Sequence, residues 1–185
     1  MKEMARLGLV LFIVASISAL VLSYTNQVTE PLIAQKSEEA AKKSRQTVLP
    51  EATEFKKIEG ADFGSDIVSE LYEGYSGSEL KGYVARTLPV GYSGPVEVIV
   101  GLNLDGSISG VSIGNHKETP GLGSKASGEF KDQYTGMNTN EPIDVIKSGQ
   151  PKENEVVAIS GATITSRAVT TGINEAAKAV LETNK

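Results

Sequence analysis

The stretch that decides the fold is PVEVIVGLNLDGSISGVSIGNH, residues 95–116. Its first half, Val96–Leu104, is rich in β-branched residues, and its second half, Ile108–Ile113, repeats that composition. The Asp-Gly step between the two halves is a strong signal for a tight hairpin turn. The stretch therefore predicts two antiparallel strands and, with them, an antiparallel sheet.

Elements on either side of this hairpin extend the prediction to an α+β fold. KGYVARTL at 81–88 indicates another strand, EPIDVIK near Ile143 a further one, and 51–78 only short elements. The sequence from Glu118 to Gly136 predicts a loop that leads into a polar helical piece. Near the C-terminus, apolar residues at helical spacing predict an amphipathic helix that packs on the sheet: Ala168, Val169, Ile173, Ala176, Ala177, Val180 and Leu181.

The N-terminus predicts a membrane anchor, because no charged residue occurs between Leu7 and Thr29. A helix over this span covers about 35 Å, enough to cross a bilayer with some tilt. Lys2 and Arg6 precede it, so the positive-inside rule places the N-terminus in the cytoplasm and the rest outside. A cleaved signal peptide is the alternative, but the apolar region is long for one and has no convincing small-x-small cleavage site.

Four segments follow from this pattern: a cytoplasmic N-terminus (1–6), a transmembrane anchor (7–29), a helical stalk (30–50) and an extracytoplasmic domain (51–185). In the stalk, Glu38 and Lys42, and likewise Glu39 and Lys43, stand four residues apart in the orientation that favours a helix. We therefore expect a single-pass protein of the cytoplasmic membrane that contacts lipid through its first helix.

Composition excludes several classes of function. The chain has no cysteine and one histidine, so an iron–sulfur cluster, a c-type haem and a disulfide framework are excluded, and a metal site is not expected. The formal net charge of −5 offers no electrostatic footprint for nucleic acid. Redox chemistry in this chain would therefore have to come from an organic cofactor.

Hydroxyl side chains crowd the stretch ISGATITSRAV, residues 159–169, where the last helix begins. A helix N-terminus has unpaired N–H groups and a positive dipole end, so it can hold an anion such as phosphate. Gly161 removes a side chain where a ligand must approach. Ser160, Thr163 or Ser166 could equally be an ordinary N-cap, which is a common feature.

A second polar cluster occupies the loop that precedes the polar helical piece. Pro120 restricts Thr119 to extended backbone, and Gly121 and Gly123 permit a tight turn with exposed amides that could approach a ring system closely. The loop could be a solvent loop, with His116 and Lys117 merely on the surface, or the wall of a pocket for a planar polar ligand. GYSGP at 91–95 is by itself a turn.

Taken together and in this order, GYSGP, ETPGLG and SGATITS resemble the FMN-binding domain shared by RnfG and NqrC, subunits of bacterial ion-translocating electron-transport complexes. The resemblance also includes the anchor and TNQVTEPLI at 25–33. The short chain and compact stalk favour RnfG over the longer NqrC.

The resemblance implies covalently attached FMN. In the family, a dedicated flavin transferase joins the FMN phosphate to the threonine that closes S-G-A-T, which here is Thr163. Val157 stands where the transferase motif usually has aspartate. No residue of the domain is expected to be catalytic, and the remaining residues expected to bind the cofactor are Tyr92, Glu118, Thr119, Pro120, Gly121, Leu122, Gly123, Ser160, Gly161, Ala162 and Thr165.

The resemblance further implies that the protein carries electrons as one component of an Rnf-type complex. Such a complex passes electrons between ferredoxin and NAD and couples the transfer to sodium or proton movement, so its other subunits are the expected partners. The alternatives are an NqrC-like protein of a related complex, a stand-alone exterior flavin reductase, and an anchored binding module without a cofactor.

Overall fold

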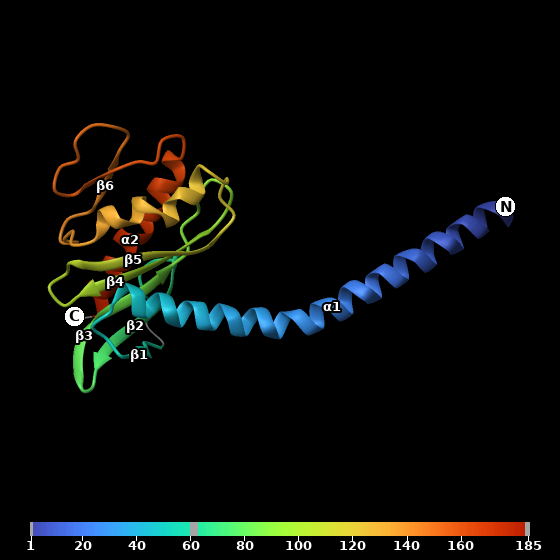
Figure 1. Ribbon diagram of the computed structural model, residues 1–185, viewed down its shortest axis with the longest axis horizontal. Helices are drawn as coiled ribbons and strands as arrows, with labels where there is room; N and C mark the ends of the chain where they lie inside the picture. Colours follow the sequence, from blue (N-terminus) through green and yellow to red (C-terminus); the bar gives the residue numbers. More distant parts are fainter. Residues whose placement is uncertain (1, 60–62, 184–185) are drawn as a thin grey trace. The chain divides into compact units, whose positions relative to one another are not determined.

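The computed structural model describes residues 2–59 and 63–183 and divides the chain into two compact units. The first unit is Met1–Ala41 and the second is Lys42–Lys185. A single helix, α1 (Lys2–Val48), forms the first unit and continues into the second (Figure 1). The compact second unit thus begins inside the segment expected to be a stalk.

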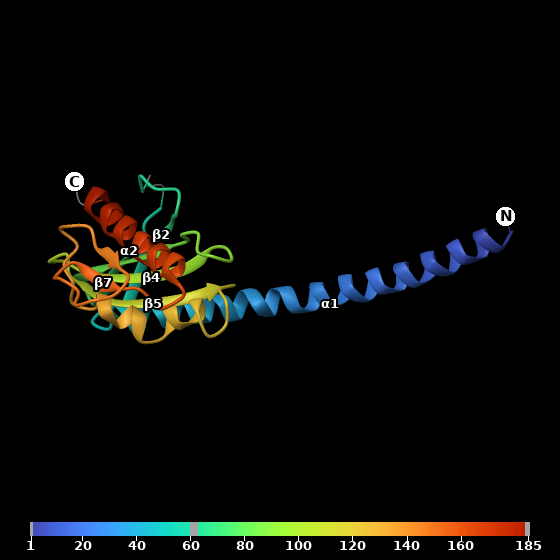
Figure 2. The same ribbon diagram turned by 90° about the horizontal axis from the view of Figure 1, so that it is seen from above.

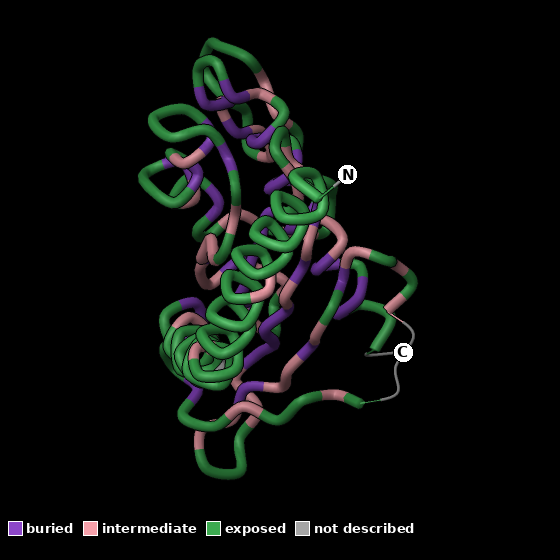
Figure 3. The backbone as a smooth tube through the Cα atoms, turned by 90° about the vertical axis from the view of Figure 1, so that its right-hand side faces the viewer, coloured by how far each residue is buried: buried purple, intermediate pink, exposed green. Residues whose placement is uncertain are grey.

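In the first unit nearly all residues of α1 are exposed (Figure 3), and none between Leu7 and Thr29 is charged. By length and composition, it is the one helix among the described residues that could cross a membrane. The hydroxyls of Thr25 and Thr29 donate to the carbonyls of Val21 and Thr25, at 2.8 and 2.9 Å, so the helix itself satisfies these polar groups. Pro31 lies inside the helix without ending it.

The second unit is built on a five-stranded antiparallel sheet in the order β1-β2-β3-β4-β5. The predicted hairpin is confirmed, because β4 and β5 pair as neighbours around the turn at Asp105-Gly106. The strand expected at 81–88 is also confirmed, as β3. The strands are β1 (Glu54–Lys57), β2 (Val68–Ser76), β3 (Glu79–Thr87), β4 (Val96–Asn103) and β5 (Ile108–His116).

The prediction of only short elements between 51 and 78 was wrong, because β2 is nine residues long. Its sequence, VSELYEGYS, lacks a clean alternation of apolar and polar residues. The sheet accommodates the charges by pairing them: Glu70 lies 2.7 Å from Lys57 on β1 and 3.9 Å from Arg86 on β3. These partners come from other strands, so no local pattern reports them.

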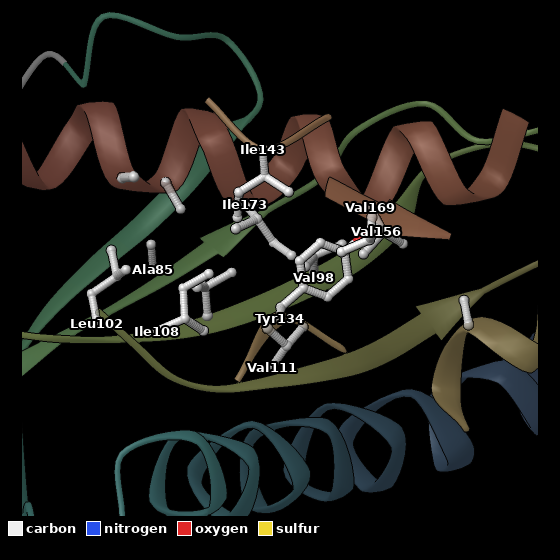
Figure 4. Packing of buried hydrophobic residues seen from close by; sticks show 14 of the residues in the cluster. Ala85, Val98, Leu102, Ile108, Val111, Tyr134, Ile143, Val156, Val169 and Ile173 are labelled. Carbon is white, nitrogen blue, oxygen red and sulfur yellow. The ribbon is translucent and has the colours of Figure 1, made fainter. Parts of the chain in front are cut away.

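Helix α2 (Thr163–Thr183) packs on one face of the sheet, as the apolar spacing predicted (Figure 2). Val169, Ile173 and Ala176 are fully buried against Val98 and Leu102 in the main core (Figure 4). Leu181 was placed on the same apolar face, but it is 53% exposed. It lies in the last turn of α2, beyond the residues that meet the core.

The opposite face of the sheet receives the last turn of α1 and the residues that follow it. Val48 and Leu49 are buried there with Val84 and Ile99. Glycine permits the close approach: a Cβ at Gly101 would lie only 2.1 Å from the carbonyl oxygen of Val48. The C-terminal turn of α1 is therefore an integral part of the second unit.

Irregular structure covers the remaining side of the core. The polar helical piece consists of two 3-10 helices, η1 (Gly123–Ser127) and η2 (Glu129–Tyr134). The strand expected near Ile143 is present as β6 (Asp144–Ile146), but it pairs in parallel with β7 (Glu155–Val157) in a separate two-stranded sheet. This pairing brings the chain back to the start of α2.

Candidate functional site

A cavity of about 560 Å³ lies where three segments distant in the sequence meet. One segment is the turn before β4, one is the loop between β5 and η1, and one is the start of α2. The residues that line it are Tyr92, Glu118, Thr119, Leu122, Gly123, Gly161, Ala162, Thr163, Ile164 and Thr165.

Nine of these ten residues are ones that the sequence singled out, and Ile164 is the addition. Three of the expected residues, Ser160, Pro120 and Gly121, do not line the cavity. A Cβ at Gly121 would have no protein atom within 4 Å, so this glycine faces open space. Its φ of +76° shows that it is needed for the turn.

Glu118 is a buried carboxylate in the cavity wall, with 5% of its surface exposed. Its carboxylate accepts hydrogen bonds from the Thr165 hydroxyl and from the backbone N–H of Ser93, the latter at 2.9 Å. The backbone N–H of Tyr92 is a further donor. Burial raises the pKa of Glu118, but these hydrogen bonds outweigh it and hold the pKa below its ordinary value.

His116, the one histidine of the chain, supports the loop on which Glu118 lies. Its Nδ1 accepts the backbone N–H of Glu118 at 3.3 Å, and its Nε2 lies 3.4 Å from the hydroxyl of Ser127. His116 thus joins the end of β5 to η1 and is not merely a surface histidine.

Two glycines leave the space that the Glu118 side chain fills. A Cβ at Gly91 would lie 2.7 Å from Glu118 Oε1, and a Cβ at Gly123 would lie 2.7 Å from Oε2. The Gly123 Cβ would also approach the Thr165 hydroxyl to 2.9 Å. Sequence reasoning missed Gly91 as part of this site, although GYSGP drew attention as a turn.

The loop that leads into α2 is held from inside the helix. The Ser166 hydroxyl accepts the N–H of Ile159 at 2.9 Å and donates to the carbonyl of Ala162 at 3.0 Å. Gly161 allows the turn with a φ of +77°, and a Cβ there would lie 3.3 Å from Leu122. The segment that presents Thr163 is therefore fixed without any ligand.

Hydrogen bonding distinguishes the three hydroxyls at the start of α2. Thr165 is 1% exposed and donates a hydrogen bond to Glu118. Ser166 is completely buried, and its hydroxyl makes two hydrogen bonds with the loop that precedes α2. Thr163 is half-buried, lines the cavity, and makes no side-chain hydrogen bond within residues 2–59 and 63–183. Its hydroxyl is the one that remains available to a ligand.

None of the hydroxyls acts as the ordinary N-cap that the sequence left open. Ala162, which precedes α2, has no side-chain acceptor. Ser166 is the first residue whose N–H reaches a carbonyl of the helical pattern, 3.0 Å from Ala162. The residues of the preceding turn line the cavity, and no acidic residue occurs in the first turn of α2. This end of the helix suits an anion.

A buried chain of hydroxyl groups continues from this loop into the core. Thr170 donates to the carbonyl of Ser166 at 2.9 Å, and the Tyr134 hydroxyl lies 2.7 Å from that of Thr170.

The Gln133 side chain binds both the N–H and the carbonyl of Val157, at 2.9 and 3.1 Å. Val157 is therefore held through its backbone.

No group of three or more His, Asp or Glu side chains in the described part of the chain is arranged to hold a metal ion. The polar groups at the cavity are instead one carboxylate, several hydroxyls and backbone amides. Such a set suits an organic ligand with polar edges.

Comparison with known families accounts for both ends of the chain. Residues 91–178 match the FMN-binding domain family, and residues 1–48 match the RnfG N-terminal region. The first match includes all three segments of the cavity, and the second covers the whole of α1.

Relatives with assigned names match over nearly the full length. The G subunit of the Na(+)-translocating ferredoxin:NAD(+) oxidoreductase complex of Acetobacterium woodii is 41% identical over 94% of this chain and 89% of its own. The G subunit of the proton-translocating ferredoxin:NAD(+) oxidoreductase complex of Clostridium ljungdahlii is 32% identical over 92% of this chain and 88% of its own.

Solved structures share the fold at lower identity. The C subunit of the Na(+)-translocating NADH-quinone reductase from Parabacteroides distasonis superposes with a TM-score of 0.63 at 20% identity, covering 81% of this chain and 94% of its own. Shewanella oneidensis NqrC gives 0.54 at 19% identity, covering 76% of this chain and 74% of its own. The full-length relatives, together with the two matched regions, establish that this chain belongs to the RnfG family, the G subunits of membrane-bound ion-translocating oxidoreductase complexes.

Proposed function

We propose that this chain is the electron-carrying RnfG component of a complex that transfers electrons between ferredoxin and NAD and couples the transfer to ion translocation, through FMN joined to Thr163 by a phosphoester. The observation that carries the proposal is the cavity itself: Thr163, whose hydroxyl makes no hydrogen bond within residues 2–59 and 63–183, lines it together with Glu118, Thr119, Leu122 and Gly123. Two motifs some forty residues apart thus form one site.

The residues present fit FMN. The volume of about 560 Å³ lies within the range of about 300–1,000 Å³ typical of small-molecule sites. Leu122 and Ile164 offer apolar surface for a ring system, and the start of α2 offers N–H groups and a positive dipole end for a phosphate. Bound FMN would supply reversible electron transfer, which no side chain of this cysteine-free chain offers.

The chain's own residues position and enclose the cofactor. Thr163 holds the phosphate end, Ser166 fixes the loop before it, and Glu118 with Thr165 keeps the facing wall in place. Thr163 serves as an attachment point and not as a nucleophile that turns over, because a separate flavin transferase makes the bond.

The proposal includes the topology. Lys2 and Arg6 remain in the cytoplasm, α1 crosses the membrane once, and the second unit lies on the extracytoplasmic side. Protease added to sealed, right-side-out vesicles should then digest the domain, whereas protection of the domain in such vesicles would reverse the orientation.

The partners follow from the same family. The other subunits of the complex surround the anchor and exchange electrons with the domain, and the flavin transferase acts during maturation. The names of the two relatives specify different ions, sodium for one and protons for the other. The proposal therefore does not assign the coupling ion.

The experiment is to express the full chain with and without a flavin transferase and to examine it after denaturing electrophoresis. Yellow fluorescence that stays with the band only when the transferase is present supports the proposal, and its absence under both conditions contradicts it. Co-purification with other membrane subunits would indicate a component of a complex. A stand-alone flavin reductase would instead purify alone and reduce free flavin.

A further inference from the structure

Arg167 is an exposed cation one helical turn after the attachment residue Thr163. It lines a second hollow, of about 370 Å³, together with Pro89, Val90 and Ile164. Ile164 also lines the main cavity, so one side chain forms a wall of both spaces. The hollow that contains Arg167 is therefore the immediate neighbour of the cofactor cavity.

Arg167 forms no ion pair within the described residues of the domain. Arg86 pairs with Glu97 at 2.6 Å, and Arg45 lies 4.4 Å above the ring of Tyr72. By contrast, no carboxylate within residues 2–59 and 63–183 lies in ion-pair distance of Arg167.

Helix geometry puts Arg167 within reach of Thr163. Residues four apart lie on the same face, with their Cβ atoms about 5–6 Å apart. Long side chains on a helix also tend to point back toward its N-terminus, a direction in which the Arg167 guanidinium can reach the turn that begins at Thr163.

The chemistry of the attached group completes the argument, which rests on the proposed function. A phosphodiester on Thr163 retains one negative charge, and a guanidinium can donate two parallel N–H hydrogen bonds to its free oxygens. We propose that Arg167 is a positioning residue that pairs with the phosphodiester on Thr163 and fixes the phosphate end of the cofactor.

Lys125 provides a matched control. It is also exposed and unpaired among the described residues, but it lies in η1 and lines a different hollow with Gly128, Glu129 and Phe130. A general effect of surface charge would appear equally at Lys125 and Arg167. A specific pairing with the phosphodiester would appear at Arg167 alone.

The test measures how fast an arginine-specific dicarbonyl reagent, phenylglyoxal, modifies the full chain in detergent, with and without covalent FMN. Peptide mass mapping gives the rate at Arg167, with Arg86 as the internal reference, and reports in the same spectra whether Thr163 carries FMN. We expect attachment to slow modification of Arg167 about two- to fivefold, as for an exposed ion pair, and to leave Arg86 unchanged. Raising the salt concentration should reduce this protection, because screening weakens an ion pair but not steric shielding.

A second measurement follows the ³¹P resonance of the phosphodiester. Arg167→Gln should move this resonance away from its position in the parent protein. Arg167→Lys keeps the charge and should move it less, and Lys125→Gln should not move it. Equal reactivity of Arg167 in the two forms, protection that salt does not change, or a resonance insensitive to Arg167→Gln would each overturn the pairing while leaving the attachment intact. Absence of FMN from Thr163 would overturn the proposed function and, with it, the pairing.

Discussion

Thr165 on α2 donates its hydroxyl hydrogen to the buried carboxylate of Glu118, across 47 residues of sequence. This hydrogen bond joins the two segments that form the cavity, one from the loop after β5 and one from the start of α2. Because both residues are at least 95% buried, the bond is shielded from water and fixes the spacing of the two walls before any cofactor binds.

Removing the hydroxyl of Thr165 should therefore reduce stability. Thr165→Val leaves the buried carboxylate without one of its donors, at a cost of about 1–3 kcal/mol in the free energy of unfolding. Thr163→Val removes a hydroxyl that makes no hydrogen bond in the described structure, so its cost should stay within about 0.5 kcal/mol. Urea unfolding of the two variants without FMN checks this, and equal losses would contradict the assigned roles.

The Glu118 carboxylate should also contribute a specific pH dependence. Because its folded-state pKa lies below the ordinary value of 4.5, its contribution is present above that pH and is lost as the pH falls through the folded-state pKa. The difference in unfolding free energy between the parent and Glu118→Gln should be constant near neutral pH and shrink below about pH 4.5. Urea titrations from pH 7 to pH 3 measure it, and a difference that grows in acid would contradict the depressed pKa.

The two glycines of ETPGLG should behave differently. Gly123→Ala places a Cβ within 2.7 Å of Glu118 and should change the absorbance fine structure of the attached flavin. Gly121→Ala strains the turn, at about 1–2 kcal/mol, but meets no neighbouring atom, so the flavin spectrum should match that of the parent. Absorbance spectra of both holoproteins decide this. A changed spectrum in Gly121→Ala alone would place the ring on the other side of the loop.

The last turn of α1 should be required for the stability of the domain. A chain that begins at Lys42 keeps Val48 and Leu49, whereas one that begins at Glu51 loses both. Each buried side chain is worth about 1.5–3 kcal/mol, so the shorter chain should be less stable by about 3–6 kcal/mol. Thermal unfolding of the two soluble fragments compares them, and equal stabilities would show that the stalk merely rests on the sheet.

Local sequence patterns predicted β4, β5 and α2 correctly. The Asp-Gly turn predicted the hairpin of β4 and β5, and the apolar spacing predicted α2, because each pattern lies within one element. Strand β2 was missed because it lacks a clean alternation, and the partners of its Glu70 lie on β1 and β3, which the local sequence does not reveal. The exposure of Leu181 depends on where the sheet ends beneath α2.

The site was predicted through motifs, and the structure adds the division of roles. SGATITS contains four hydroxyl side chains, and only tertiary contacts distinguish the hydrogen-bonded Thr165 and Ser166 from Thr163. The contribution of Gly91 depends on the position of the Glu118 side chain, which comes from a loop 25 residues beyond Ser93. Spacing along the chain carries no information about such contacts.

The most direct test of the account is peptide mass mapping of the full chain after expression with a flavin transferase. The account predicts that the peptide containing residues 159–167 carries one FMN, that fragmentation places it on Thr163, and that Thr163→Val abolishes it. An FMN on Thr165 or Ser166, or covalent flavin retained in Thr163→Val, would contradict the account, because both of those hydroxyls are buried and engaged in this structure.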